Sequence, residues 1–219
     1  RFFPAAGNHD YTDGNGIAEF TDYFDLPGAG VAGLHNSKSE LYYDVIQGPI
    51  HVFVLDSQAI RTNPLSFAAQ RAWLQAGLEA SVTPWQVIVM HHSPFSSSSI
   101  HGSDPTVQWP FGDWGVDLVM SGHDHIYERI VRNGITYIVN GLSGGANSYP
   151  LGAPVEGSQF RYRQDHGAVF ITATDTTLSG SFVIGHDGRV EDRFSVSTAS
   201  KAPLPFPHRE LMPRFVTDS

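Results

Sequence analysis

The stretch 85–95 reads WQVIVMHHSPF, an apolar run followed at once by two histidines. Continuous apolar runs of this length are typical of strands buried on both faces of an α/β protein. A helix is predicted just before it, over 67–80, because Phe67, Trp73 and Leu74 recur at roughly helical spacing. Helix, strand and histidine loop in this order predict an α/β fold with a site at the strand ends.

Two further segments carry histidines in a similar setting. The stretch 116–125, VDLVMSGHDH, is a second strand-like run that leads into His123 and His125. Residues two apart on an extended segment point to the same side, so these two imidazoles are predicted to face one cavity. Taken alone, a pair of exposed loop histidines is an equally good interpretation. The third segment is GNHD at 7–10.

Together the three segments favour a metal site. Neutral imidazole and amide oxygen bind divalent or ferric ions and orient phosphate. His91 directly continues its strand and is the predicted ligand, whereas His92 is predicted to point away as a packing or surface residue. Asn8 offers its carbonyl oxygen to the metal, and His9 a proton to a leaving group. Asp10 is predicted to orient His9.

Two neighbouring stretches complete the predicted site. Tyr127 and Glu128 follow GHDH and are predicted to lie behind the ligands, where they would fix the imidazole tautomers. His101, in SSSSIHGSD, is a candidate for gripping substrate oxygens; a solvated loop histidine is an interpretation of equal weight.

Composition limits the classes of function. The 219 residues, 41% of them hydrophobic, suffice for one folded domain. A formal charge of −9 disfavours nucleic acid as a partner, but metal ions can reverse the local field for a small anion. No run of 18 apolar residues occurs, so no membrane span is predicted. The chain has no cysteine, so neither a disulfide nor a thiolate metal site is available.

The remaining elements are predicted from local patterns. We expect a short strand over 1–6, a helix over 17–26, and a hairpin of strands 40–46 and 50–55. Residues 143–167 are predicted to form a long loop, and 168–198 to form antiparallel strands with turns at Ser179-Gly180 and Asp187-Gly188. The catalytic domain is therefore predicted to span 1–198, and 199–219 to be an extended tail rich in proline.

The order GNHD, histidine at a strand end, then GHDHIYER resembles the calcineurin-like metallophosphoesterase superfamily. The YER extension and the stretches WPFGDWGVDLVMSGHDH and VNGLSGG look most like its purple-acid-phosphatase branch, in particular bacterial secreted relatives. The resemblance covers roughly residues 1–198. It implies a two-sheet β-sandwich flanked by helices in α-β-β-α layers, and an extracellular or periplasmic location.

The resemblance also implies roles for single residues. Asn8, His91 and His123 would hold one ion of a dinuclear centre of Fe, Zn or Mn, and His125 would belong to the other. His9 would be the catalytic proton donor, and His101 would contact substrate. The implied reaction is hydrolysis of a small phosphate monoester by a metal-activated hydroxide.

One departure from the family pattern leaves alternatives open. In the family, a segment with Asp-x-His or Asp-x-Gly and a Gly-Asp segment precede GNHD, and here only six residues precede Gly7. We therefore expect the chain to be N-terminally truncated, holding the C-terminal two-thirds of the domain. The alternatives are a non-catalytic remnant that binds metal weakly or not at all, and a hydrolase of small phosphodiesters.

Overall fold

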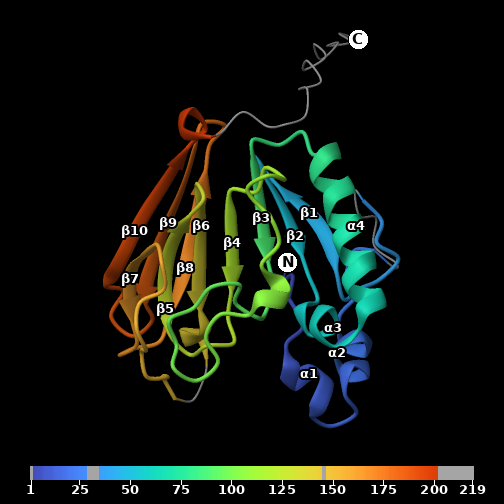
Figure 1. The fold of residues 1–219 in the computed structure, drawn as a ribbon, viewed down its shortest axis with the longest axis horizontal. Coiled ribbons are helices and arrows are strands. Elements are labelled where there is room, and N and C mark those ends of the chain that lie inside the picture. The colour runs from blue at the N-terminus through green and yellow to red at the C-terminus, as the bar shows by residue number, and fades with distance from the viewer. Residues whose placement is uncertain (1, 29–34, 145–146, 202–219) are drawn as a thin grey trace.

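Two β-sheets form the centre of the molecule (Figure 1). The computed structural model describes residues 2–28, 35–144 and 147–201. In that part of the chain a seven-stranded sheet has the order β1-β2-β3-β4-β6-β5-β7, and a three-stranded sheet has the order β10-β9-β8. The strands are β1 Tyr43–Gln47, β2 Ile50–Val54, β3 Trp85–Val89, β4 Leu118–Ser121, β5 Tyr127–Arg132, β6 Ile135–Asn140, β7 Ser158–Tyr162, β8 Gly167–Ala173, β9 Thr177–Ile184 and β10 Val190–Ser197.

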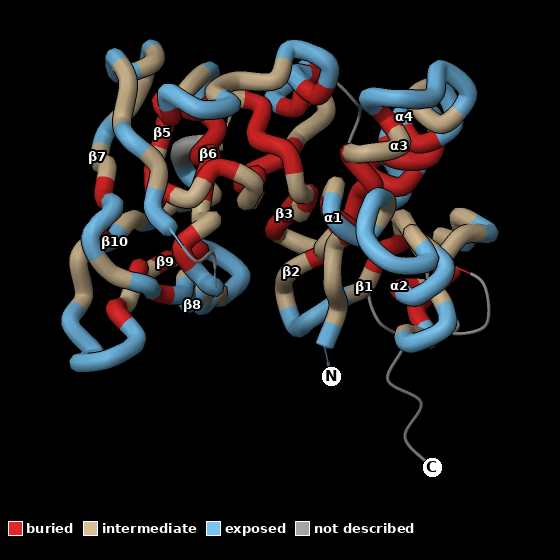
Figure 2. Tube along the Cα trace, turned by 90° about the horizontal axis from the view of Figure 1, so that it is seen from below, coloured by how far each residue is buried: buried red, intermediate tan, exposed pale blue. Residues whose placement is uncertain are grey.

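Different partners cover the two faces of the large sheet. On one face, Phe53 belongs to a buried cluster with Trp73 of helix α4 (Pro64–Ala80). On the other face, Leu118 packs with Phe182 of the small sheet. Figure 2 shows the buried stretches along β3, β5 and β6, with the outer turns of the chain exposed. The predicted two-sheet α/β fold is confirmed.

Helix α4 begins where the sequence supplies start signals. Pro64 occupies its first turn, where a backbone N–H would lack a partner in any case. The Asn63 side chain caps the helix by accepting from the backbone N–H groups of Leu65, at 2.9 Å, and Ser66, at 3.4 Å. The helix predicted over 67–80 is therefore confirmed, with its first turn at Pro64.

Four strands of the large sheet, β2, β3, β4 and β6, are mutually parallel neighbours. Their carboxyl ends consequently lie along one edge of the sheet, which is where α/β proteins place their sites. Helix α3 (Ser57–Thr62) follows β2 at this edge, and helices α1 (Asn8–Thr12) and α2 (Ile17–Tyr23) belong to the segment that precedes β1. The hairpin of β1 and β2 is antiparallel, as predicted.

Three local predictions were wrong. Residues 2–6 form no strand; in this segment the carbonyl of Pro4 accepts from the Tyr43 hydroxyl at 2.7 Å. Strand β7 lies within the predicted loop 143–167, because β5 offers it a free edge. The turn predicted at Ser179-Gly180 is absent, because Gly180 lies inside β9, where the Phe194 ring leaves no room for a Cβ. The turn before β9 is at 174–176, where the Thr174 N–H donates to the Thr177 carbonyl at 2.8 Å.

The two sheets are joined by a buried ion pair. Arg129 of β5 donates to both carboxylate oxygens of Asp192 in β10, from Nε at 2.7 Å and from Nη2 at 3.0 Å. The Tyr127 hydroxyl donates to the same carboxylate at 2.8 Å. Since Asp192 is buried, these bonds supply the partners that a buried charge requires.

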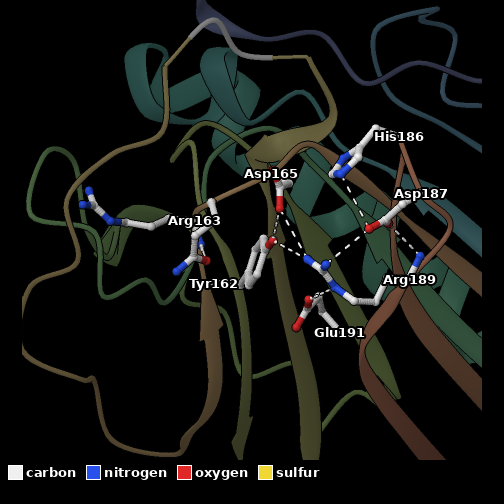
Figure 3. A network of polar contacts seen from close by, with 8 residues as sticks. Tyr162, Arg163, Asp165, His186, Asp187, Arg189 and Glu191 are labelled. Atoms are coloured by element: carbon white, nitrogen blue, oxygen red, sulfur yellow. Dashed lines mark hydrogen bonds and ion pairs between the residues drawn. The ribbon is translucent and has the colours of Figure 1, made fainter.

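A second junction lies at the surface (Figure 3). Arg189, in the turn before β10, pairs with Asp165 at 3.4 Å and with Asp187 at 3.2 Å, and also contacts Glu191. The Tyr162 hydroxyl of β7 donates to Asp165 at 2.6 Å. Figure 3 shows these side chains meeting around the guanidinium of Arg189. The turn at Asp187-Gly188 is confirmed, with Gly188 in the left-handed region at φ +73°.

Some predicted elements include residues that the structure does not describe. Residues 202–219 of the predicted tail and residues 145–146 of the predicted loop 143–167 are among them. Lys201 at the start of that tail is described, and its ammonium donates to Asp117 at 2.9 Å and contacts the Pro84 carbonyl. Among the described helices, none has both the length and the apolar composition that a membrane crossing requires.

Candidate metal centre

The first site segment is placed by a glycine that lies against a histidine ring. A Cβ added to Gly7 would lie 2.9 Å from Cε1 of His91, closer than real side chains approach. The backbone N–H of Gly7 donates to the Asp10 carboxylate at 2.7 Å, which closes the first turn of α1. Glycine is therefore required here for packing, and it brings Asn8 to the carboxyl edge of β3.

Three donor atoms converge at this edge. Nε2 of His91 lies 2.8 Å from Oδ1 of Asn8 and 3.0 Å from Nδ1 of His123. A single ring N–H cannot donate well to both neighbours, so the arrangement is poor as a plain hydrogen-bond cluster. Two ligands at right angles and about 2.1 Å from one ion would lie about 3 Å apart. The spacing therefore fits one metal ion shared by Asn8, His91 and His123.

The environment keeps these imidazoles neutral. Burial lowers the pKa of His91 to about 4, with smaller contributions from the charges of His9, His101 and His125. Burial likewise lowers the pKa of His123 to about 4, with a contribution from His101. Neutral imidazole is the form that binds metal, so the ligand lone pairs are available near neutral pH. The predicted site histidines His9, His101 and His125 are thus near enough to His91 for their charges to act on its pKa.

A buried carboxylate lies beside this cluster. Asp124, between the two histidines of GHDH, is fully buried, and in the described part of the chain neither of its oxygens has a hydrogen-bond partner. Its charge acts to raise the pKa of His123, which means that it attracts positive charge there. A buried unpaired carboxylate is costly unless a cation compensates it. This is a second observation that fits a bound metal ion.

His123 and His125 are not related by the alternation of an extended segment, on which their predicted common orientation depended. His123 has φ +63°, in the left-handed region, so the alternation of an extended segment is broken between them. The Nδ1 atom of His125 bonds to the Asn147 carbonyl at 2.8 Å, and its ring stacks on Tyr149 at 4.2 Å. The tautomer is thereby fixed, and Nε2 is left as the atom that can take a ligand.

His9 is exposed over 79% of its side chain, and its partner is not the predicted one. Its Nδ1 atom lies 3.0 Å from the Asp13 carboxylate, whereas the Asp10 carboxylate is used by the Gly7 N–H. The prediction that Asp10 orients His9 is wrong because adjacent residues of a helix point in different directions, while residues four apart share a face.

Neither Tyr127 nor Glu128 makes a hydrogen bond to a site imidazole in the described part of the chain. The Tyr127 hydroxyl is bound to Asp192, and its ring stacks on Phe182 at 4.1 Å. The Glu128 carboxylate accepts from the N–H and hydroxyl of Ser97, at 2.7 and 2.5 Å, and from the Ser158 hydroxyl at 2.6 Å. The predicted role in fixing imidazole tautomers is wrong, because alternation along β5 sends these side chains to opposite faces. Glu128 instead anchors the loop that leads to His101.

His92 was predicted to point away, and the structure places it in the cluster. Its ring lies 4.4 Å from that of His123, and His91, His92 and His123 offer nitrogens within 4.8 Å of one another. Both of its nitrogens are engaged, Nδ1 with the Ser57 hydroxyl at 2.9 Å and Nε2 with Arg61 at 2.9 Å. His91 and His123 are therefore better candidate metal ligands than His92. The buried His92 ring lies between these two histidines and Arg61.

Sequence reasoning missed Arg61 and Ser57 altogether. Both lie on α3, for which the sequence shows no strong helical period, and the available signal was the position of this segment directly after the β2 strand. The ring of His101, the predicted substrate contact, lies 4.1 Å from that of His123. Asp56, which follows β2, is buried, caps α3 by accepting from the Ala59 N–H at 2.9 Å and contacts the Tyr11 hydroxyl.

A layered α/β fold with imidazole and amide donors at the carboxyl edge of its parallel strands is the architecture of the metallophosphatases. The family model for calcineurin-like phosphoesterases matches residues 1–127, and the chain belongs to this family. By structure, the chain is similar to purple acid phosphatase PPD1 from yellow lupin seeds, with a TM-score of 0.70 and 20% identity over 92% of this chain and 40% of that one.

Curated relatives match about half of this chain. A phosphoenolpyruvate phosphatase of Allium cepa is 32% identical over 123 residues, 52% of this chain and 24% of the relative. The Fe(3+)-Zn(2+) purple acid phosphatase 12 of Arabidopsis thaliana is 36% identical over 118 residues, 48% of this chain and 24% of the relative. The matched part spans about a quarter of the length of these relatives.

Proposed function

We propose that this chain is the metal-binding part of a phosphatase domain that hydrolyses small phosphate monoesters at a dinuclear centre. The observation that carries the proposal is the convergence of Asn8 Oδ1, His91 Nε2 and His123 Nδ1 within 3.0 Å contacts. Three metal-ligating atoms from segments far apart in the sequence meet at the edge where α/β enzymes bind their substrates. Relatives named as phosphatases support a monoester substrate.

The residues present would divide the work as follows. Asn8, His91 and His123 would hold one ion, of Fe, Zn or Mn, and Nε2 of His125 would be available to the second. When bound, such ions supply a water of lowered pKa and neutralise phosphoryl oxygens. His9, exposed and paired with Asp13, delivers a proton to the departing alcohol. His101, beside His123, orients the phosphoryl group.

Metal binding is tested first, by titrating the chain with Zn²⁺ or Mn²⁺ in a calorimeter. We expect binding by the native chain and at least a tenfold loss in Asn8→Ala and His123→Ala, as the loss of a ligand should produce. His186→Ala is the matched control, because His186 is an exposed histidine in the turn between β9 and β10 and pairs with Asp187 there. Equal affinity in all four proteins would overturn the metal assignment.

Turnover is tested with an aryl phosphate and the corresponding diaryl phosphate. We expect phosphate release from the monoester, lost in the Asn8 and His123 variants and kept in His186→Ala. Metal binding without any turnover would favour the non-catalytic module, and faster turnover of the diester would favour the phosphodiesterase. The extracellular or periplasmic location remains a prediction from the resemblance.

A further inference from the structure

A cavity of about 310 Å³ opens next to the candidate metal centre. Its wall includes His123 and His101 on the side of the centre, and Arg61, His92, Ser103 and Asp104 beyond them. This volume corresponds to roughly ten water molecules at liquid density, which is more than one phosphoryl group fills. The cavity therefore has room for part of the leaving group of a substrate whose phosphoryl group lies at the metal ligands.

The guanidinium of Arg61 is the only Lys or Arg group in the described wall of this cavity. Three neighbours hold it: the Asp104 carboxylate pairs with Nε, and Nη1 lies 2.9 Å from His92 Nε2 and 3.4 Å from Gln58 Oε1. Since Arg can only donate, Nε2 of His92 accepts, and its Nδ1–H donates to the Ser57 hydroxyl at 2.9 Å. The chain from Ser57 through His92 to Arg61 fixes the guanidinium before any ligand arrives.

One edge of the guanidinium remains available. Within the part of the chain that the structure describes, Nη2 of Arg61 makes no hydrogen bond, and 37% of the side chain is exposed. The His92 ring separates Arg61 from His123, with ring centroids of the two histidines 4.4 Å apart. Arg61 therefore contacts the far side of the His92 ring from His123 while lining the same cavity. It faces the remainder of the substrate.

We propose that Arg61 binds a second anionic group on the leaving alcohol, so that the site selects phosphate monoesters whose leaving group carries a carboxylate or a phosphate. This inference rests on the proposed function for the position of the reacting phosphoryl group. A fixed guanidinium with free N–H donors forms charge-assisted bonds to such groups, and its orientation carries little further entropy cost. The ion pair with Asp104 orients the guanidinium through Nε and leaves Nη2 to the ligand.

The test compares two monoesters that differ by one carboxylate, phenyl phosphate and 3-carboxyphenyl phosphate. We expect the native chain to have a kcat/KM about tenfold or more higher for the carboxylated substrate, which is the range for a hydrogen bond to a charged group. Arg61→Gln, which keeps an N–H donor for His92, should remove this preference. Arg71→Gln, an exposed arginine of α4 outside the cavity, should keep it.

A binding measurement separates this proposal from the proposed function. Calorimetry of 3-hydroxybenzoate against phenol requires no turnover, and the carboxylate should bind at least tenfold more tightly to the native chain than to Arg61→Gln. Absence of turnover together with this binding difference would refute the phosphatase and retain the subsite. Equal affinity of the native chain for 3-hydroxybenzoate and phenol would overturn the role of Arg61. A folded Arg61→Gln variant that still prefers the carboxylated compound would overturn it as well.

Circular dichroism establishes whether the variant folds. If Arg61→Gln does not fold, Arg61→Lys replaces it, because an ammonium retains the charge beside Asp104 but cannot bridge His92 and the ligand at once. A reduced preference in Arg61→Lys supports the proposal, and an unchanged preference overturns it.

Discussion

The side chains of Asn8 and His91 meet at 2.8 Å although 83 residues separate them in the chain. Asn8 opens a helix of five residues, and His91 follows a central strand of the large sheet. Their contact depends on Gly7, which lies against the His91 ring. It also depends on the Tyr11 hydroxyl of α1, which hydrogen-bonds to Asp56 just after β2. The candidate centre is thus held by packing around it as well as by its own ligands.

Gly7→Ala should disturb the centre without altering any ligand. The added methyl group would meet the His91 ring at 2.9 Å, so the ring or α1 must shift. Overpacking of this kind costs about 1 to 3 kcal/mol, and we expect Zn²⁺ affinity to fall about tenfold. Gly185→Ala is the control, because its nearest neighbour would be at 3.6 Å. Native affinity in Gly7→Ala, measured by calorimetry, would contradict the packing argument.

The stability of the metal-free chain should fall as the solution is acidified. The pKa values of His91 and His123 are lowered to about 4 and that of His92 to about 2, from 6.5 when unfolded. At pH values between the folded and unfolded pKa, the unfolded chain binds more protons than the folded chain. The contribution of these histidines to the free energy of unfolding is therefore full above about pH 6.5 and is lost as the pH falls toward 4.

Urea midpoints between pH 7.5 and 5.5 measure this effect. Burial raises the pKa values of Asp56 and Asp117, and these two groups contribute to the pH dependence of stability in the opposite direction. His92→Gln should flatten the profile, because it removes one titrating group and keeps a polar side chain. A native profile that does not change with pH would show that the imidazoles are not held neutral.

Asp192→Ala should be strongly destabilising. The substitution leaves the Arg129 guanidinium and the Tyr127 hydroxyl without their buried partner between the two sheets. Removing one member of a buried ion pair costs about 3 to 5 kcal/mol. Chemical denaturation measures the free energy of unfolding, with Asp187→Ala on the exposed turn as the comparison. A loss no larger than in the comparison variant would mean that the junction does not hold the sheets together.

Glu128→Gln should loosen the loop that carries His101. The carboxylate accepts three hydrogen bonds on its two oxygens, from the Ser97 N–H, the Ser97 hydroxyl and the Ser158 hydroxyl. In the amide of Gln, the nitrogen can only donate, so at least one of these hydrogen bonds is lost. We expect a loss of about 1 to 3 kcal/mol and faster hydrogen exchange at the Ser97 amide. Glu156→Gln, at an exposed ion pair with Arg132, is the control; equal exchange rates in both variants would contradict the anchoring role.

The sequence by itself determined the sheet and the placement of candidate metal ligands at the ends of its strands. Runs such as WQVIVM are apolar enough to be buried on both faces, which requires parallel strands in the middle of an α/β sheet, and His91 then lies at a strand end. The three segments with histidines also carried the family resemblance. These properties are local, because they depend on composition and on order along the chain.

Tertiary structure decided the partners. The left-handed backbone of His123, the pairing of His9 with Asp13 and the attachment of Glu128 to Ser97 depend on which surfaces pack together. Arg61 became part of the site only because β2 and β3 are parallel neighbours, which brings α3 beside His92. Hydrogen bonds between distant segments depend on the packing of the whole core, so a local sequence pattern cannot predict them.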